Sequence, residues 1–115
     1  MTKEFNRSTG IFGEIQAAQY LKKKKYKILA KNFMCVLGEI DIVAQQKKTI
    51  VFVEVKKRET LRFGWPREAV DEYKQEKIRK VALYYLKQFK LLESPVRFDV
   101  IEIIGDNINH IENAF

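Results

Sequence analysis

The chain of 115 residues contains a single cysteine, Cys35, and a single histidine, His110. These counts argue against a disulfide framework, a zinc site of cysteine and histidine ligands, and catalysis by a Cys–His or Ser–His–Asp system. The longest apolar runs, such as residues 50–53, are far shorter than a membrane span or the apolar segment of a secretory signal. We therefore expect a protein of a reducing cytoplasm that has no membrane partner.

Proline and glycine are also scarce, at two and five residues, so few breaks interrupt the apolar pattern. With 46% hydrophobic and 32% charged residues, the composition is typical of one soluble globular domain over residues 1–115. Helical periodicity predicts a helix over residues 8–24, capped by Ser8 or Thr9, and a second from Pro66 to about Phe89. Their apolar faces are Ile11, Ala17, Ala18 and Leu21 in the first, and Val70, Ile78, Val81, Ala82, Tyr85 and Phe89 in the second.

Alternating patterns predict strands over residues 26–33, 37–44, 50–56 and 96–104, with a short fifth over 110–114. The second and third strands are expected to form a hairpin, and residues 57–65 a polar loop. The economical arrangement is an α/β fold in which helices flank a single mixed sheet.

Basic residues are in excess, with 22 Lys and Arg against 15 Asp and Glu, for a net charge of +7. Residues 1–90 carry +11 and residues 91–115 carry −4. This distribution fits a polyanionic partner such as DNA, although a basic surface without a partner explains it about equally well.

Acidic residues interrupt the apolar strands. Alternation puts Glu54 and Lys56 on one face of the third strand, with Ile50 and Phe52. In the second strand it separates two sets, Glu39, Asp41 and Val43 on one face and Ile40, Ile42 and Ala44 on the other. If paired residue numbers in the hairpin sum to an odd value near 93 or 95, Asp41 and Glu54 are neighbours on one face; an even sum separates them.

Two adjacent carboxylates repel each other unless a proton or a cation lies between them, and oxygen ligands favour Mg²⁺ or Mn²⁺. Such an ion lowers the pKa of a bound water and offsets charge on a phosphoryl group. With Lys56 beside it, the pair is suited to phosphodiester hydrolysis. The alternative is that Glu54 and Lys56 form an ion pair at a solvated strand end.

Charged residues also lie on the apolar stripes of both predicted helices, Glu14 on the first and Lys74 on the second. A core-facing charge is costly unless it is paired, although each side chain could instead extend to solvent. Four basic residues flank the predicted site and are candidate phosphate contacts: Lys57, Arg58, Arg62 and Arg67. A further run, Lys22–Lys25 with Lys27 and Lys31, either contacts DNA or complements the helix dipole.

Gly38-Glu39-Ile40-Asp41 followed by Glu54-Val55-Lys56 resembles the motif of the PD-(D/E)XK nuclease superfamily. Over nearly the whole chain, the sequence is similar to the YraN family of uncharacterised bacterial proteins, inferred to be endonucleases. The matching segments include Gly13-Glu14, Gly38–Ala44, Val51–Lys56, Phe63-Gly64, Glu68–Val70, Arg97–Ile101 and Ile111–Phe115.

The resemblance implies a restriction-endonuclease-like αβββαβ core similar to that of archaeal Holliday junction resolvases. It also implies that Asp41 and Glu54 bind the metal, that Lys56 is catalytic and that Glu14 supports the metal site. Glu39 and Lys74 would support these residues or contact phosphate. The implied partner is DNA, including branched DNA, and the relatives that cut junctions act as homodimers.

The sequence departs from the family pattern at Lys25, where glycine is usual, and at Met34-Cys35-Val36, where polar residues are usual. Two other functions remain open. One is a nucleic-acid-binding module that keeps the fold without catalysis, and the other is a structural protein whose acids form ion pairs.

Overall fold

The computed structural model describes residues 3–58 and 70–115, and side chains from residue 12 onward within these ranges. Helix α1 (Lys3–Lys23) is followed by three strands, then by helix α2 (Glu72–Gln88) and two further strands. The strands are β1 (Lys27–Cys35), β2 (Gly38–Gln46), β3 (Thr49–Arg58), β4 (Val96–Ile104) and β5 (Asn107–Ile111). The predicted order, αβββαβ followed by a short fifth strand, is confirmed.

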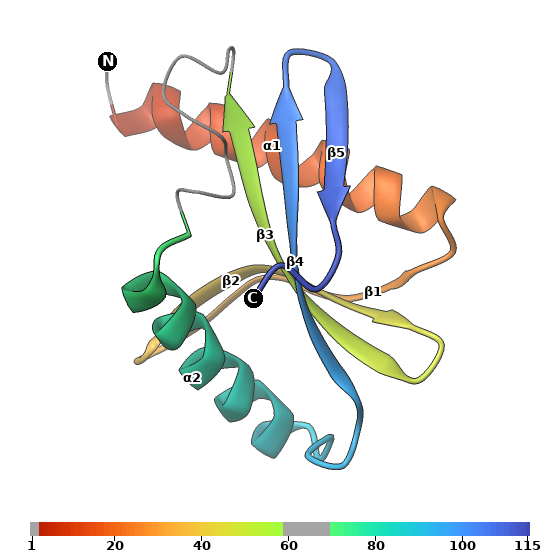
Figure 1. Ribbon diagram of the computed structural model, residues 1–115. Helices are drawn as coiled ribbons and strands as arrows, with labels where there is room; N and C mark the ends of the chain where they lie inside the picture. Colours follow the sequence, from red (N-terminus) through yellow and green to blue (C-terminus); the bar gives the residue numbers. More distant parts are fainter. Residues whose placement is uncertain (1–2, 59–69) are drawn as a thin grey trace.

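The described strands form one sheet in the order β1-β2-β3-β4-β5. Strands β3 and β4 are parallel and the other neighbours are antiparallel, so the sheet is mixed as predicted. The parallel pair requires a long crossover, and α2 supplies it. Figure 1 shows α1 and α2 on opposite sides of the sheet.

Each face of the sheet has its own apolar core. On the α1 face, Ala17, Ala18 and Leu21 pack against a group of strand residues: Ile42, Ala44, Val51, Val53, Ile101 and Ile103. On the α2 face, Phe52 is 1% exposed and its ring makes edge contact with Tyr85 at 5.8 Å between centroids. Because β3 is apolar on both faces, it is the interior strand on which both cores are built.

Several predicted boundaries are wrong. Helix α1 begins at Lys3, so Ser8 and Thr9 lie inside the helix rather than capping it, because no proline stops the helix upstream. Helix α2 begins after Asp71, whose side chain accepts a hydrogen bond from the Lys74 N–H at 2.9 Å, rather than at Pro66. Pro66 lies outside the described residues, as does most of the predicted loop 57–65. Phe89 is 51% exposed instead of buried, because it follows the helix as its C-cap.

The predicted fifth strand begins and ends earlier, at Asn107–Ile111, because it pairs with β4 across the turn at Gly105. No described helix is long and apolar enough to cross a membrane.

One side chain of β2 does not follow the predicted alternation. Ile40 packs in the core on the α2 face, whereas Ile42 lies in the core on the α1 face. The pairing of β2 with β3 ends at Ile42 and Val53, while the pairing with β1 continues. Before Ile42, over residues 38–41, β2 diverges from β3 and its side chains turn with it. The alternation therefore fails where the predicted site begins.

Candidate active site

The hairpin register brings the two predicted metal ligands together. Ile42 pairs with Val53, so paired residue numbers sum to 95, and the odd-sum register is confirmed. Asp41 and Glu54 adjoin this last pair, and they are close enough for the charge of Asp41 to act on Glu54. Oδ2 of Asp41 accepts a hydrogen bond from the N–H of Val55 at 2.8 Å. The Asp41 carboxylate thus holds the diverging strand β2 to β3.

Glu54 is a buried carboxylate at the end of the apolar part of β3, and only 5% of its surface is exposed. Burial and the charge of Asp41 together raise the pKa of Glu54 to about 8, against the opposing effect of Lys74 and Lys56. Its Oε1 is buried and has no hydrogen-bond partner among the described residues. A buried carboxylate oxygen without a partner is costly, so this atom has a coordination position to offer.

Two lysines adjoin Glu54. Nζ of Lys74, from the first turn of α2, lies 4.0 Å from Oε2 of Glu54. Burial lowers the pKa of Lys56 to about 8, and the proximity of Lys74 contributes to this shift. The Lys74 side chain is 39% exposed, so the prediction that it faces the core holds only in part, and its ammonium reaches Glu54.

Glu14 approaches the site from α1. Burial raises its pKa, with contributions from the charges of Asp41 and Glu39, while the Asn32 side chain acts in the opposite direction. Burial also raises the pKa of Asp41, because the Val55 N–H and Lys56 only partly compensate. The charge of Asp41 thus raises the pKa of both Glu54 and Glu14.

The predicted phosphate contacts divide between the two faces. Nζ of Lys57 donates a hydrogen bond to Oε1 of Gln16 at 2.6 Å, on the α1 face and away from Lys56. Arg58 alternates onto the face of Lys56 and is half-buried, and its Nε has no hydrogen-bond partner among the described residues. Arg62 and Arg67 lie outside the described residues.

Sequence reasoning missed two buried acids on β4. Glu102 is 3% exposed and pairs in register with Lys56, so it lies on the same face as Glu54. Asn109 donates a hydrogen bond to its Oε1 at 2.7 Å, and its Oε2 has no partner within the described part of the chain. The signal was a glutamate in an otherwise apolar strand.

The second missed acid, Asp99, is fully buried on the α1 face and accepts four hydrogen bonds. Two come from Arg97, at 2.9 Å each, one joins Nε2 of His110 at 2.6 Å, and one comes from the N–H of Asn113 at 3.0 Å. Burial opposes ionisation, but these partners together lower the pKa of Asp99. Arg97 also donates to the Tyr26 hydroxyl at 2.7 Å, so this group links four segments of the chain.

The residues present fit a divalent cation held by few protein ligands. Within residues 3–58 and 70–115, no three His, Cys, Asp or Glu side chains converge as a set that could hold a metal ion. Mg²⁺, however, commonly binds one or two carboxylates and completes its coordination with water and substrate phosphate. Asp41 and Glu54, with the unpartnered Oε1 of Glu54, provide that smaller set.

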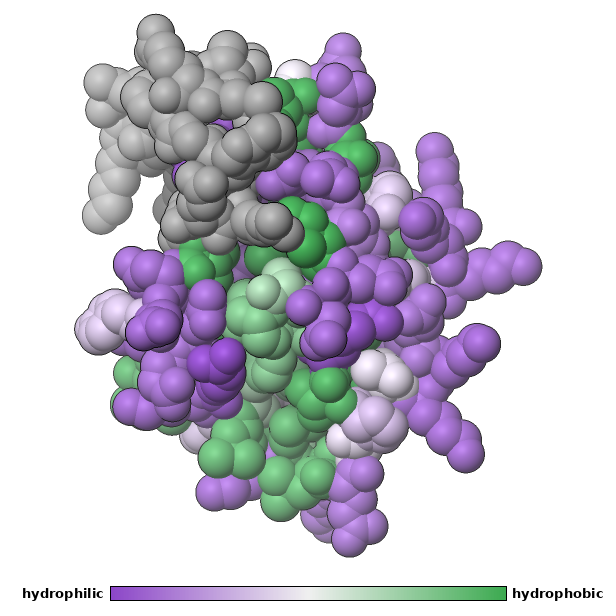
Figure 2. All heavy atoms as spheres, viewed as in Figure 1, coloured by the Kyte–Doolittle hydropathy of each residue, from purple (hydrophilic) through white to green (hydrophobic). Residues whose placement is uncertain are grey.

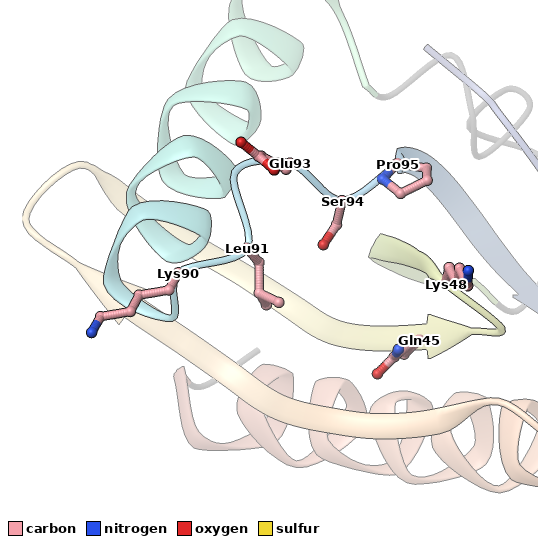
Figure 3. A pocket seen from close by; sticks show the side chains of 7 residues that line it. All are labelled: Gln45, Lys48, Lys90, Leu91, Glu93, Ser94 and Pro95. Carbon is pink, nitrogen blue, oxygen red and sulfur yellow. The ribbon is translucent and has the colours of Figure 1, made fainter.

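A pocket of about 340 Å³ lies at the other end of β3, and Figure 3 shows its side chains around the β2–β3 turn and the α2–β4 connection. It is lined by Gln45, Lys48, Lys90, Leu91, Glu93, Ser94 and Pro95. None of the predicted site residues lines it, and it lacks the paired carboxylates of the Asp41–Glu54 site.

Comparisons with known proteins give a consistent match. The model of the uncharacterised protein family UPF0102 matches residues 13–103. A UPF0102 protein of Caldanaerobacter subterraneus is 48% identical and aligns over 100% of both chains. One from Clostridioides difficile is 48% identical over 96% of this chain and 98% of its own. One from Thermodesulfovibrio yellowstonii is 52% identical over 90% of this chain and 91% of its own.

Proposed function

Because the chain belongs to the UPF0102 family, the YraN-type family that the sequence motifs indicated, and this family is uncharacterised, its function has to come from the site. We propose that the protein is a metal-dependent endonuclease that hydrolyses phosphodiester bonds in DNA. The observation that carries the proposal is the buried Glu54, which keeps an oxygen without a partner among the described residues and lies within reach of the charges of Asp41 and Lys56.

Each side chain has a role that its environment favours. Asp41 and Glu54 would hold the cation, which supplies an activated water and offsets phosphoryl charge. Lys56, with a pKa of about 8, is largely protonated at pH 7 and has a minor neutral form. Its ammonium form would offset charge on the phosphoryl oxygens, and its neutral form would accept a proton from the attacking water. Lys74 would stabilise the Glu54 carboxylate, and Glu14 would support Asp41 from α1.

The charge of the chain favours a nucleic-acid substrate. The net charge is +7, and the basic residues are concentrated in the first 90 residues, which also contain Asp41, Glu54 and Lys56. The resemblance to junction resolvases favours branched DNA and a dimeric enzyme.

A second function has an observation of its own. Lys74 already lies 4.0 Å from the Glu54 carboxylate, so the acids could act as partners of lysines in a protein that binds DNA without cutting it. In that case the same surface would bind nucleic acid, and added metal would change nothing at Glu54.

The decisive experiment is a cleavage assay on linear, flapped, forked and four-way DNA with Mg²⁺, Mn²⁺ or EDTA. We expect cleavage that depends on the metal and falls about 100-fold or more in Asp41→Asn, Glu54→Gln and Lys56→Met. Glu76→Gln removes an exposed carboxylate from α2 and serves as the matched control, with unchanged activity.

DNA binding is measured in parallel in EDTA. If wild type and all variants bind the same DNA equally while none cleaves it, the protein is a binding module and the endonuclease proposal is wrong. Equal cleavage by wild type and Glu54→Gln would also overturn the proposal, because the carboxylate would then have no part in the reaction.

A further inference from the structure

Six lysines follow one edge of the molecule, and we call them the lysine track. Lys22 and Lys23 end α1, Lys24 and Lys25 connect it to the sheet, and Lys27 and Lys31 lie on β1. All six are exposed, and β1 is an edge strand of the sheet. Figure 2 shows hydrophilic side chains projecting on the side of the molecule where Figure 1 has the end of α1 and the start of β1.

The charges of the lysine track are not neutralised within the described part of the chain. The ion pairs found there involve Lys74, Arg79, Arg97 and His110, and none involves a track lysine. The dipole of α1 favours cations at its last turn, which accounts for Lys22 and Lys23. It does not account for Lys27 and Lys31, which lie on a strand.

Lys25 occupies a position that favours glycine. The N–H of Tyr26 bonds to the carbonyl of Leu21, and the N–H of Lys25 bonds to that of Lys22, both at 2.9 Å. This is the Schellman pattern that ends a helix, and it holds Lys25 at a φ of 70°. A side chain is strained in this left-handed conformation, so lysine is present here against the preference of the fold.

The track leads to the candidate active site. From Lys27 to Lys31 the strand advances about 13 Å, at roughly 3.3 Å per residue. A register shift between Ile28 and Ala30 places the two lysines on opposite faces of this edge strand, Lys27 beside Gln45 and Lys31 beside Ile42. Lys31 pairs with Ile42, the neighbour of Asp41, and its charge acts on Glu14. Since phosphates of one DNA strand recur about every 3.4 Å along the helix axis, the β1 part of the track spans roughly four phosphates.

We propose that the lysine track binds the phosphate backbone of duplex DNA and guides one strand toward Asp41 and Glu54. The approach to the acids rests on the proposed function, whereas binding along the track does not depend on cleavage.

The test is binding of a fluorescent duplex DNA in EDTA, measured from low to moderate salt. Lys27→Ala/Lys31→Ala should weaken binding several-fold and reduce the slope of log K against log salt by up to about 1.8. Lys25→Gly should reduce the slope of log K against log salt by about 0.9. The melting temperature of this variant should stay equal to or above that of wild type. A merely structural role for Lys25 predicts no change in the slope.

The matched controls lie at the end of α2. Lys90 also has a left-handed φ, of 57°, so Lys90→Gly repeats the loss of charge and strain at another place. Lys87→Ala/Lys90→Ala matches the double variant. If these controls reduce the slope of log K against log salt as much as the track variants do, binding reflects net charge alone and the proposal is wrong.

Two further outcomes separate the alternatives. If the track variants lose binding to vesicles of phosphatidylserine and phosphatidylcholine but keep duplex binding, the partner is an anionic membrane and the proposal fails. If binding depends on the track but no DNA is cleaved with any metal, the track proposal holds and the endonuclease proposal fails. If DNA is cleaved but its binding does not depend on the track lysines, the track proposal is wrong and the endonuclease proposal holds.

Discussion

Replacing Glu54 by glutamine should stabilise the metal-free protein, even though it removes a residue of the candidate active site. The pKa of Glu54 is raised from its ordinary value of 4.5 to about 8. Between these two values the unfolded chain carries an ionised Glu54 and the folded chain a protonated one. The folded state therefore binds more protons, and the wild type loses stability as the pH rises through this window.

The size of the effect follows from the shift. Each pH unit inside the window costs the wild type up to about 1.4 kcal/mol, and glutamine does not titrate. The advantage of Glu54→Gln over wild type should thus increase by about 2–3 kcal/mol between pH 5 and pH 7. Lys56 remains protonated in the unfolded chain and largely so in the folded chain up to about pH 7, so it contributes little to this difference.

Urea unfolding followed by circular dichroism at pH 5, 6 and 7 measures the effect. Glu76→Gln on the exposed side of α2 is the control, with an expected change below about 0.5 kcal/mol at each pH. A Glu54→Gln protein that is no more stable than wild type at pH 7, with a difference that is flat across pH, would refute the reasoning.

Added Mg²⁺ connects this measurement to the proposed function. An ion bound by Asp41 and Glu54 stabilises only the folded wild type, by about 3 kcal/mol when its concentration is 100 times the dissociation constant. It should leave Glu54→Gln nearly unchanged. A metal effect of equal size in both proteins would mean that the ion binds elsewhere.

Two further predictions concern stability. Asp99→Asn removes the fully buried carboxylate that pairs with the partly buried Arg97, and should cost about 3 kcal/mol in urea unfolding at pH 7. The pKa of Asp99 is lowered, so its contribution is present at neutral pH and is lost as the pH falls below about 4. Asp106→Asn, in the exposed β4–β5 turn, is the control, and an equal loss in both would contradict the role of Asp99. Gly38→Ala should cost about 1–3 kcal/mol, because Gly38 has a φ of 142° and a Cβ there would lie 3.3 Å from Val81. Gly105→Ala, where a Cβ meets nothing within 4 Å, should cost less, and the opposite order of melting temperatures would count against this account.

Much of the fold was predictable because it follows from periodicity. Strand β4 has the predicted bounds, and the apolar face of α1 from Ala17 to Leu21 is buried as predicted. Whether paired residue numbers in the β2–β3 hairpin sum to an odd or an even value was harder to predict from the sequence. Gln46 pairs with Thr49, which leaves Lys47 and Lys48 as a two-residue turn. Neither is the glycine or asparagine that usually marks such a turn, so both registers remained open until the structure was known.

The buried acids of β4 could not be predicted because their partners are distant in the sequence. The Arg97–Tyr26 hydrogen bond spans 71 residues, and His110 reaches Asp99 only through the pairing of β4 with β5. The divergence of β2 from β3 before Ile42, over residues 38–41, was equally hidden, since strict alternation is a property of a flat strand and this strand turns away from its neighbour. The acids of the candidate site were found because two of them lie close together on one hairpin.

The buried carboxylates of Asp99 and Glu54 differ in hydrogen bonding and in pKa, so each shows what the other lacks. Asp99 is as buried as Glu54, yet both of its oxygens are hydrogen-bonded and its pKa is lowered. Glu54 keeps an oxygen without a partner among the described residues, and its pKa is raised to about 8. A carboxylate retained only for stability should resemble Asp99, because burial without partners costs free energy. Glu54 is therefore retained at a cost to stability, and a residue that destabilises its own fold in this way is the expected mark of a site that binds something else.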